Sequence, residues 1–245
     1  MIKGIPLDAP LYEIDEERGI EYRNCKAVTA LFTLKNDLGD LIPEGLKSMG
    51  NGGVWISHYS FSTVGIYNEY ISVVQVEDEV GDRGYYIPYI YVTNDSALAA
   101  GREVAGAPKK LAKIELTQEL DLVQGILERP TGKRLVTVTM KPNVRAKELI
   151  DYILPKPTYL YSIRHLPPLK GKGGATQLIK WYADIDFHVD PAGEKVIFMG
   201  PVSITYDSPS VIDPVHKLEI GTVISAIYFE FDMKLGFVDI LRELR

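Results

Sequence analysis

The feature that most constrains the fold is a long succession of short apolar runs, rich in β-branched and aromatic residues and separated by Gly, Pro, Asn and Asp. Runs of this kind predict β-strands joined by turns. The ten runs are Ala27–Thr33, Val54–Thr63, Gly65–Val76, Tyr85–Thr93, Leu135–Met140, Tyr159–Ile163, Gln177–Ile185, Lys195–Phe198, Val202–Tyr206 and Val223–Asp232. Pro88 interrupts the fourth run, and because proline cannot donate to a strand ladder, we expect a bulge or a sheet edge there.

Signals for helices are few. The segments expected to be helical are Asn36–Leu41, Asp95–Arg102, Ala146–Ile153 and Met233–Leu244. Strands and helices do not alternate regularly, which argues against a doubly wound parallel sheet. A mainly β (α+β) fold, with an antiparallel barrel or sandwich and a few peripheral helices, fits the pattern better. The 245 residues contain no linker, so we expect one domain, residues 1–245.

Composition narrows the class of protein. The chain is 46% hydrophobic and 24% charged, which is typical of a soluble globular protein, and its net charge of −6 gives no reason to expect nucleic acid or an anionic membrane as a partner. Cys25 is the only cysteine, so an intrachain disulfide framework is excluded. Residues 1–19 lack the long apolar stretch of a signal peptide, and the longest apolar run, Val223–Phe229, is far too short to span a membrane. We therefore expect a cytoplasmic protein.

The strongest chemical signal is a pair of adjacent lysines, Lys109 and Lys110, at the end of the decapeptide 101–110. The residues around the pair are apolar, and the nearest acids along the chain are Glu103 and Glu115, so neither lysine has a local counter-ion. A lysine in apolar surroundings loses hydration, which lowers its pKa. The neutral amine can then attack a carbonyl carbon and form a Schiff base. The ordinary alternative for two neighbouring lysines is a solvated turn or strand end.

An ordinary lysine, with a pKa of about 10.4, is neutral in only about one molecule in 2,500 at pH 7. A fall of roughly three to four units would therefore be needed to make about half of the amine nucleophilic. Both desolvation and repulsion from Lys110, the pKa-tuning neighbour, would act in that direction. Adjacent strand residues point to opposite faces, so a pocket that receives Lys109 would not receive Lys110. We therefore expect desolvation to be the larger cause.

Several motifs, in the same order, resemble the acetoacetate decarboxylase family. They are GREVAGAPKKL at 101–111, LIPEGL at 41–46, YVTNDSALAAGRE at 91–103, KPTYLYSIRHLP at 156–167 and the C-terminal segment 199–232. The resemblance covers most of the chain. It implies an antiparallel, closed β-barrel that encloses an active-site cavity, a homo-oligomer, and a Schiff base on Lys109.

The resemblance also assigns other residues. Glu69 matches an active-site glutamate of the family, and a carboxylate beside the Schiff base could move protons; the alternative is an exposed strand carboxylate. Two positions depart from the family. A cavity arginine falls on Phe32, and a second glutamate falls near Val54 or Trp55. These apolar residues are expected to line the pocket, which would then favour a larger or less charged carbonyl compound.

Three further residues are candidates for the pocket wall. Arg102 and Glu103 belong to the matching segment, where they would form a salt bridge at the helix end or reach the cavity. His58 would pack in the core or lie at the surface, with pocket lining as the alternative. The four histidines lack metal-ligand spacing with one another or with cysteine, so no zinc site is expected. The loop 166–174 is expected to be a surface hairpin connection, with a lid as the alternative.

The residues and the resemblance together predict a Schiff-base lyase, most simply a decarboxylase of a β-keto acid. The iminium ion formed on Lys109 would be the electron sink, so no cofactor or metal is expected. The partner would be a small oxo acid. One alternative is a Schiff-base aldolase, dehydratase or hydratase acting on another oxo acid. The other is a barrel that binds a small ligand without turnover. The catalytic prediction requires that the nitrogen of Lys109 is shielded from water and is not held by a carboxylate.

Overall fold

A computed structural model describes residues 19–146 and 150–244. The strands are β1 (Ile20–Leu34), β2 (Leu46–Ser62), β3 (Tyr67–Asp78), β4 (Arg83–Val92), β5 (Lys109–Leu111), β6 (Lys113–Glu119), β7 (Leu122–Glu128), β8 (Arg134–Met140), β9 (Val144–Arg145), β10 (Thr158–Leu166), β11 (Ala175–Phe187), β12 (Ile197–Met199), β13 (Val202–Tyr206) and β14 (Ile220–Glu243). The helices are α1 (Asp95–Glu103), α2 (Ile150–Ile153) and two 3-10 turns, η1 (Gly39–Leu41) and η2 (Val215–Lys217). The prediction of a mainly β chain is confirmed.

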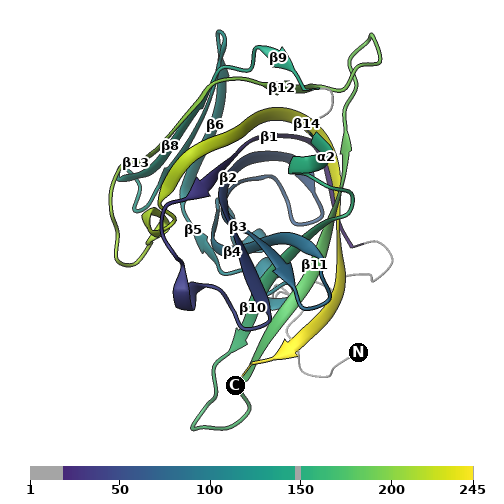
Figure 1. The fold of residues 1–245 in the computed structure, drawn as a ribbon. Coiled ribbons are helices and arrows are strands. Elements are labelled where there is room, and N and C mark those ends of the chain that lie inside the picture. The colour runs from purple at the N-terminus through teal and green to yellow at the C-terminus, as the bar shows by residue number, and fades with distance from the viewer. Residues whose placement is uncertain (1–18, 147–149, 245) are drawn as a thin grey trace.

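The strands form two sheets. The larger has ten strands in the order β1-β2-β3-β4-β10-β11-β14-β12-β9, with β5 beside β4, and β1 pairs with β14 as well as with β2. The pairings of seven strands therefore lead back to β1, and these strands curve around a common centre (Figure 1). Neighbours are antiparallel except for β10 and β5, which each run parallel to β4. The smaller sheet, β13-β8-β7-β6, lies outside this ring.

The two faces of the ring strands bury different clusters. On β1, Ala27 and Leu31 belong to the cluster inside the ring, whereas Val28, Ala30 and Phe32 belong to the cluster between the ring and the smaller sheet. This alternation follows from the period of two along a strand. Both faces are covered at residues 27–32 of β1, and this part of the strand is a nearly continuous apolar run rather than an alternating one.

A bulge in β4 sets the phase of the strand next to it. Between the pairs formed by Ser72 and Val74 of β3 the register shifts, and β4 holds one extra residue there, beside Pro88. The prediction of a bulge at this proline is confirmed. After the shift, Ile90 contributes to the inner cluster, and its parallel partner on β5 is Lys109. The bulge therefore helps to determine that Lys109, and not Lys110, faces the interior of the ring.

The helix predictions have mixed outcomes. The helix expected at Asp95–Arg102 is confirmed as α1. The helix expected at Met233–Leu244 is wrong, because these residues continue β14 almost to the chain end. β14 pairs with β1 on one side and β11 on the other, and these long-range ladders override the local helical pattern. At Asn36–Leu41 only the short turn η1 forms.

Some expectations fall on residues outside the described range. Residues 147–149 of the helix expected at Ala146–Ile153 are outside it, and α2 begins at Ile150. The leader expectation rests on residues 1–19, of which only Gly19 is described. Within 19–146 and 150–244, no helix is long and apolar enough to cross a membrane. The segment 166–174 connects β10 to β11, with a bridge between Leu169 and Lys172, as expected for a hairpin connection.

Candidate functional site

Helix α1 and the loop after it carry Lys109 to the interior. Asn94 caps α1, since its Oδ1 accepts a hydrogen bond of 2.7 Å from the N–H of Ala97. The chain then turns back through Gly106, which has a φ of +67° and whose Cβ would lie 2.5 Å from the backbone nitrogen of Arg164. Only glycine fits both conditions. The turn places Lys109 beside Ile90 on the inner face of the ring.

Lys109 is buried, with 7% of its surface exposed, and its Nζ lies 2.8 Å from Oε2 of Glu69. This separation is typical of a charge-assisted contact between an ammonium and a carboxylate. The requirement that no carboxylate holds the nitrogen of Lys109 is not met, and the expectation based on the lack of a local counter-ion is wrong. It considered only acids close along the chain, whereas Glu69 is brought beside the lysine by the pairing of β3 with β4 and of β4 with β5.

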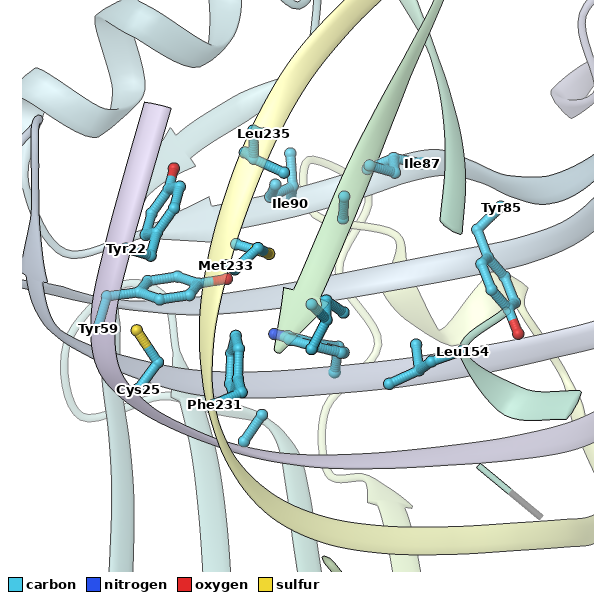
Figure 2. Close-up of a cluster of buried hydrophobic side chains, with 14 of the residues drawn as sticks. Tyr22, Cys25, Tyr59, Tyr85, Ile87, Ile90, Leu154, Phe231, Met233 and Leu235 are labelled. Atoms are coloured by element: carbon cyan, nitrogen blue, oxygen red, sulfur yellow. The ribbon is translucent and has the colours of Figure 1, made fainter. Parts of the chain in front are cut away.

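Three tyrosines surround the ion pair. Tyr59 donates to Oε1 of Glu69 at 2.9 Å, and Tyr67 donates to the hydroxyl of Tyr22 at 3.2 Å. The ring centroids of Tyr22 and Tyr59 are 4.7 Å apart, and Nζ of Lys109 lies 5.5 Å from the centre of the Tyr67 ring. Figure 2 shows Tyr22 and Tyr59 side by side. Burial, followed by the charge of Glu69, raises the pKa of all three tyrosines well above the usual value. The three hydroxyls therefore remain protonated.

Lys109 and Glu69 face a cavity of about 80 Å³. Its wall is mostly aliphatic and includes Leu31, Ile71, Ile87, Ile90, Leu154 and Met233, several of which Figure 2 shows converging from different strands. A cavity of this volume holds several waters or one small organic molecule. Removal of a charged group from water into such a space is costly unless the charge is paired. The wall thus explains why the lysine and the glutamate are found together.

Most of the polar side chains in the wall already have partners in the protein. Thr29 donates to the carbonyl of Val54 at 2.9 Å, and Tyr85 donates to the carbonyl of Ile153 at 2.6 Å. Thr158 donates to the carbonyl of Pro155 at 2.6 Å. The Lys109–Glu69 pair is thus the charged element among the described residues that line the cavity.

Lys110 points away from this site. Its Nζ donates to the carbonyl of Ile212 at 2.6 Å and to Oδ1 of Asp213 at 2.9 Å, and the same carboxylate accepts from Arg129. Adjacent residues of β5 thus face opposite sides, as the strand geometry requires. The charge of Lys110 is neutralised by Asp213 on the outer face, so its repulsion of Lys109 is weakened.

The other candidates on β1 and β2 lie on two different faces of these strands. Trp55 lines the cavity, whereas Phe32 and Val54 lie in the cluster between the two sheets, so the expectation that they line the pocket is wrong. The physical reason is the strand period, which sends Val54 and Trp55 to opposite faces. His58 shares the outer face of β2 with Val54, and its Nδ1 lies 2.7 Å from Oδ1 of Asn68. It has a packing role and does not line the cavity.

Arg102 and Glu103 are exposed at the end of α1 and do not belong to the cavity wall. The expectation that one of them reaches the cavity is therefore wrong. Arg102 instead donates to the backbone carbonyl of Lys109 at 3.3 Å, which ties the helix end to β5. Sequence reasoning missed the tyrosines. Tyr67 was detectable, because it stands two residues before Glu69 and must share its face, but Tyr22 and Tyr59 depend on strand register.

The lack of a side chain at Gly101 leaves space for the aliphatic stem of Lys109. A Cβ at this position would lie 2.5 Å from both Cδ and Cε of Lys109. Gly101→Ala is expected to displace the lysine stem and to lower kcat/KM by about 100-fold, since a shift of about 1 Å at a reacting group has that effect. The melting temperature should change little, because alanine favours the helix. Steady-state kinetics and thermal unfolding measure the two effects.

A matched control is Gly125→Ala. A Cβ at Gly125 would overlap the side chain of Ile56, in the cluster between the sheets and away from the lysine. This variant is expected to lose stability and to keep kcat/KM within about threefold of the wild-type value. Equal activity losses in the two glycine variants would contradict a specific role for the space beside Lys109.

Comparison with known proteins gives one consistent family. The family model described as "Acetoacetate decarboxylase (ADC)" matches residues 6–244. The acetoacetate decarboxylase of Burkholderia multivorans is 26% identical over 97% of this chain and 93% of its own length. The decarboxylase DEC1 of Cochliobolus heterostrophus is 26% identical over 92% of this chain and 88% of its own.

Solved structures agree with this family in fold. The crystal structure of acetoacetate decarboxylase from Legionella pneumophila superposes with a TM-score of 0.82 at 22% identity, covering 97% of this chain and 94% of that one. An acetoacetate decarboxylase-like enzyme from Sphingomonas wittichii gives a TM-score of 0.80 at 19% identity, covering 97% and 98%. At these identities the structural likeness concerns the fold alone.

Proposed function

This chain belongs to the acetoacetate decarboxylase family, and from that membership we propose that it decarboxylates a β-keto acid through a Schiff base on Lys109. The observation that carries the proposal is the placement of the Lys109 amine, buried in an apolar cavity beside one carboxylate. The family resemblance seen in the sequence is confirmed. The ring of strands around this cavity supports the barrel that the resemblance implies.

The contact with Glu69 determines how the amine becomes reactive. An ammonium group cannot attack a carbonyl, so Lys109 must first lose a proton. Oε2 of Glu69, 2.8 Å from Nζ, is the acceptor within reach. Transfer turns two buried charges into two neutral groups, and an apolar wall lowers the cost of that change. Glu69 is then a protonated acid next to the reacting atoms.

The proposed reaction follows from that arrangement. The amine of Lys109 adds to the keto carbon of the substrate, and loss of water, with a proton returned through Glu69, gives an iminium ion. The bond between the α-carbon and the carboxylate then breaks, carbon dioxide leaves, and the electron pair neutralises the iminium as an enamine. Protonation of the enamine carbon and hydrolysis release the ketone and regenerate the amine. Overall, one β-keto acid anion and one proton give one ketone and carbon dioxide.

The tyrosines support the carboxylate in this cycle. Tyr59 donates to Oε1 of Glu69, which leaves Oε2 to exchange a proton with the lysine or the substrate carbon. Because burial raises the pKa of Tyr59, the hydroxyl stays a donor and does not compete for that proton. The two oxygens of Glu69 therefore have different roles, since Oε1 is held in place by Tyr59 and Oε2 reacts.

Borohydride trapping tests the proposal. With acetoacetate present, reduction of the imine is expected to fix a covalent adduct of the size of the ketone product or the acid, located by peptide mapping at Lys109. Carbon dioxide release is then measured without borohydride. An adduct with no carbon dioxide would favour the aldolase, dehydratase or hydratase alternative. If no adduct forms with any member of a panel of oxo acids, the Schiff-base proposal is wrong and a ligand-binding role is left.

A further inference from the structure

Among the described residues, the indole N–H of Trp55 is a buried donor without an acceptor. Only 9% of Trp55 is exposed, and its Nε1 has no hydrogen-bond acceptor within the described part of the chain. A buried tryptophan ordinarily bonds its N–H, because a buried donor without an acceptor destabilises the fold. Such a group in a folded protein calls for an explanation. The indole lines the same cavity as Lys109, so it borders the space in which a bound molecule would lie.

Strand register places Trp55 relative to the ion pair. Trp55 pairs with Ile71 across β2 and β3, and Glu69 is the inward-facing residue two positions before Ile71. Diagonal neighbours of this kind are separated by about 7–8 Å on one face of a sheet. Trp55 thus stands one step along the sheet from Glu69. A small oxo acid whose keto carbon lies at Lys109 can extend in that direction, with its carboxylate pointing away from Glu69.

The chain contains a matched comparison in its other tryptophan. Trp181 is 5% exposed and lines the same cavity, but its Nε1 donates to Oγ of Ser162 at 3.1 Å. Ser162 in turn donates to the carbonyl of Ala105. The fold therefore provides an acceptor for one indole of the cavity and leaves the other without one.

We propose that the N–H of Trp55 binds the carboxylate of the oxo acid that reacts at Lys109. The inference rests on the proposed function and adds a positioning residue to it. The carboxylate needs a donor in a wall that is otherwise apolar, and a neutral indole suits a group that leaves as carbon dioxide. A cation would stabilise the charged ground state more strongly, and this stabilisation would be lost as the charge disperses. The indole orients the substrate with a smaller penalty of that kind.

Trapping with two probes isolates this contact. Acetoacetate carries the carboxylate, and acetone is the corresponding ketone without it. In Trp55→Phe, the concentration of acetoacetate that half-saturates trapping is expected to rise about 10- to 100-fold, as for a lost hydrogen bond to a charged group. The value for acetone should stay within about twofold. Trp181→Phe removes a tryptophan of the same wall and is expected to change both probes alike. Thermal unfolding of both variants checks that they fold.

A second measurement does not depend on the Trp55 variant. In Trp181→Phe the single indole N–H resonance belongs to Trp55, and acetoacetate, but not acetone, is expected to shift it downfield. The inference is overturned if Trp55→Phe affects both probes equally, or if acetoacetate leaves the indole resonance in place, as it would if a bound water served this donor. Absence of trapping in the wild-type protein would instead contradict the Schiff base, while the indole shift would still report on the carboxylate contact.

Discussion

Replacement of Lys109 by methionine is expected to abolish both decarboxylation and borohydride trapping, with kcat/KM reduced by at least about a thousandfold. Methionine keeps the length and apolar stem of the lysine and removes the nucleophile, so the cavity should stay filled. The matched variant is Lys110→Met, because Lys110 lies next in the chain but binds Asp213 on the opposite face. Lys110→Met is expected to keep measurable activity.

Kinetics with acetoacetate and intact-mass detection of the adduct measure both variants. The assignment of Lys109 as the nucleophile would be contradicted by an adduct that survives in Lys109→Met. Equal and complete loss in both variants would show that Lys110 matters as much as Lys109, against the geometry of β5. A melting temperature recorded for each protein separates loss of chemistry from loss of fold.

The buried ion pair predicts a strong coupling in stability. Removal of one partner leaves the other charge in an apolar cavity, so Lys109→Met and Glu69→Gln should each lower the free energy of unfolding by about 3–5 kcal/mol. The double variant Lys109→Met/Glu69→Gln removes both charges, and its free energy of unfolding should lie within about 1 kcal/mol of the wild-type value or above it. Urea unfolding at pH 7 of the four proteins completes the cycle.

A simple sum of the two single effects in the double variant would mean that the two groups do not interact in the folded protein. The same cycle separates stability from activity. The double variant is expected to be stable and inactive, which would show that the pair is retained for its chemistry and gives no net gain in folding. Tyr59→Phe in the wild-type background is a useful reference, since it removes one bond to Glu69 and leaves both charges.

Structural features that depend on residues close together in the chain were predicted correctly. Small residues and a cap define α1, and Pro88 marks the bulge, so both were found. The lysine and its burial were also predicted, although the apolar residues that line its cavity come from strands such as β1, β3, β4 and β14 and not from its chain neighbours. The helix expected at Met233–Leu244 failed because its residues gain two strand partners that lie far away in the chain. Propensity carries no information about such partners.

The site was predictable in part for the same reason. Glu69 was identified by family resemblance, but its contact with Lys109 depends on two strand pairings that the sequence does not reveal. Phe32 was misplaced because the face that a strand residue occupies alternates with every position, and Phe32 lies on the outer face of β1. The missing acids near Lys109 in the sequence were therefore a poor guide to its partners in space.

The arrangement of carboxylates around β5 has a consequence for how this short strand is positioned. One lysine pairs with one acid on each face of β5. Lys109 pairs with Glu69 inside the ring of strands, and Lys110 pairs with Asp213 outside it. A slip by a single residue would turn Lys110 toward Glu69 and place Leu111 where Lys110 now meets Asp213, so that only one of the two ion pairs could form. The charges on the two faces therefore favour the observed register, and the hydrogen bond from Arg102 to the carbonyl of Lys109 adds to that preference. The choice of the lysine that enters the cavity thus depends in part on an acid outside the cavity, on the opposite face of the strand.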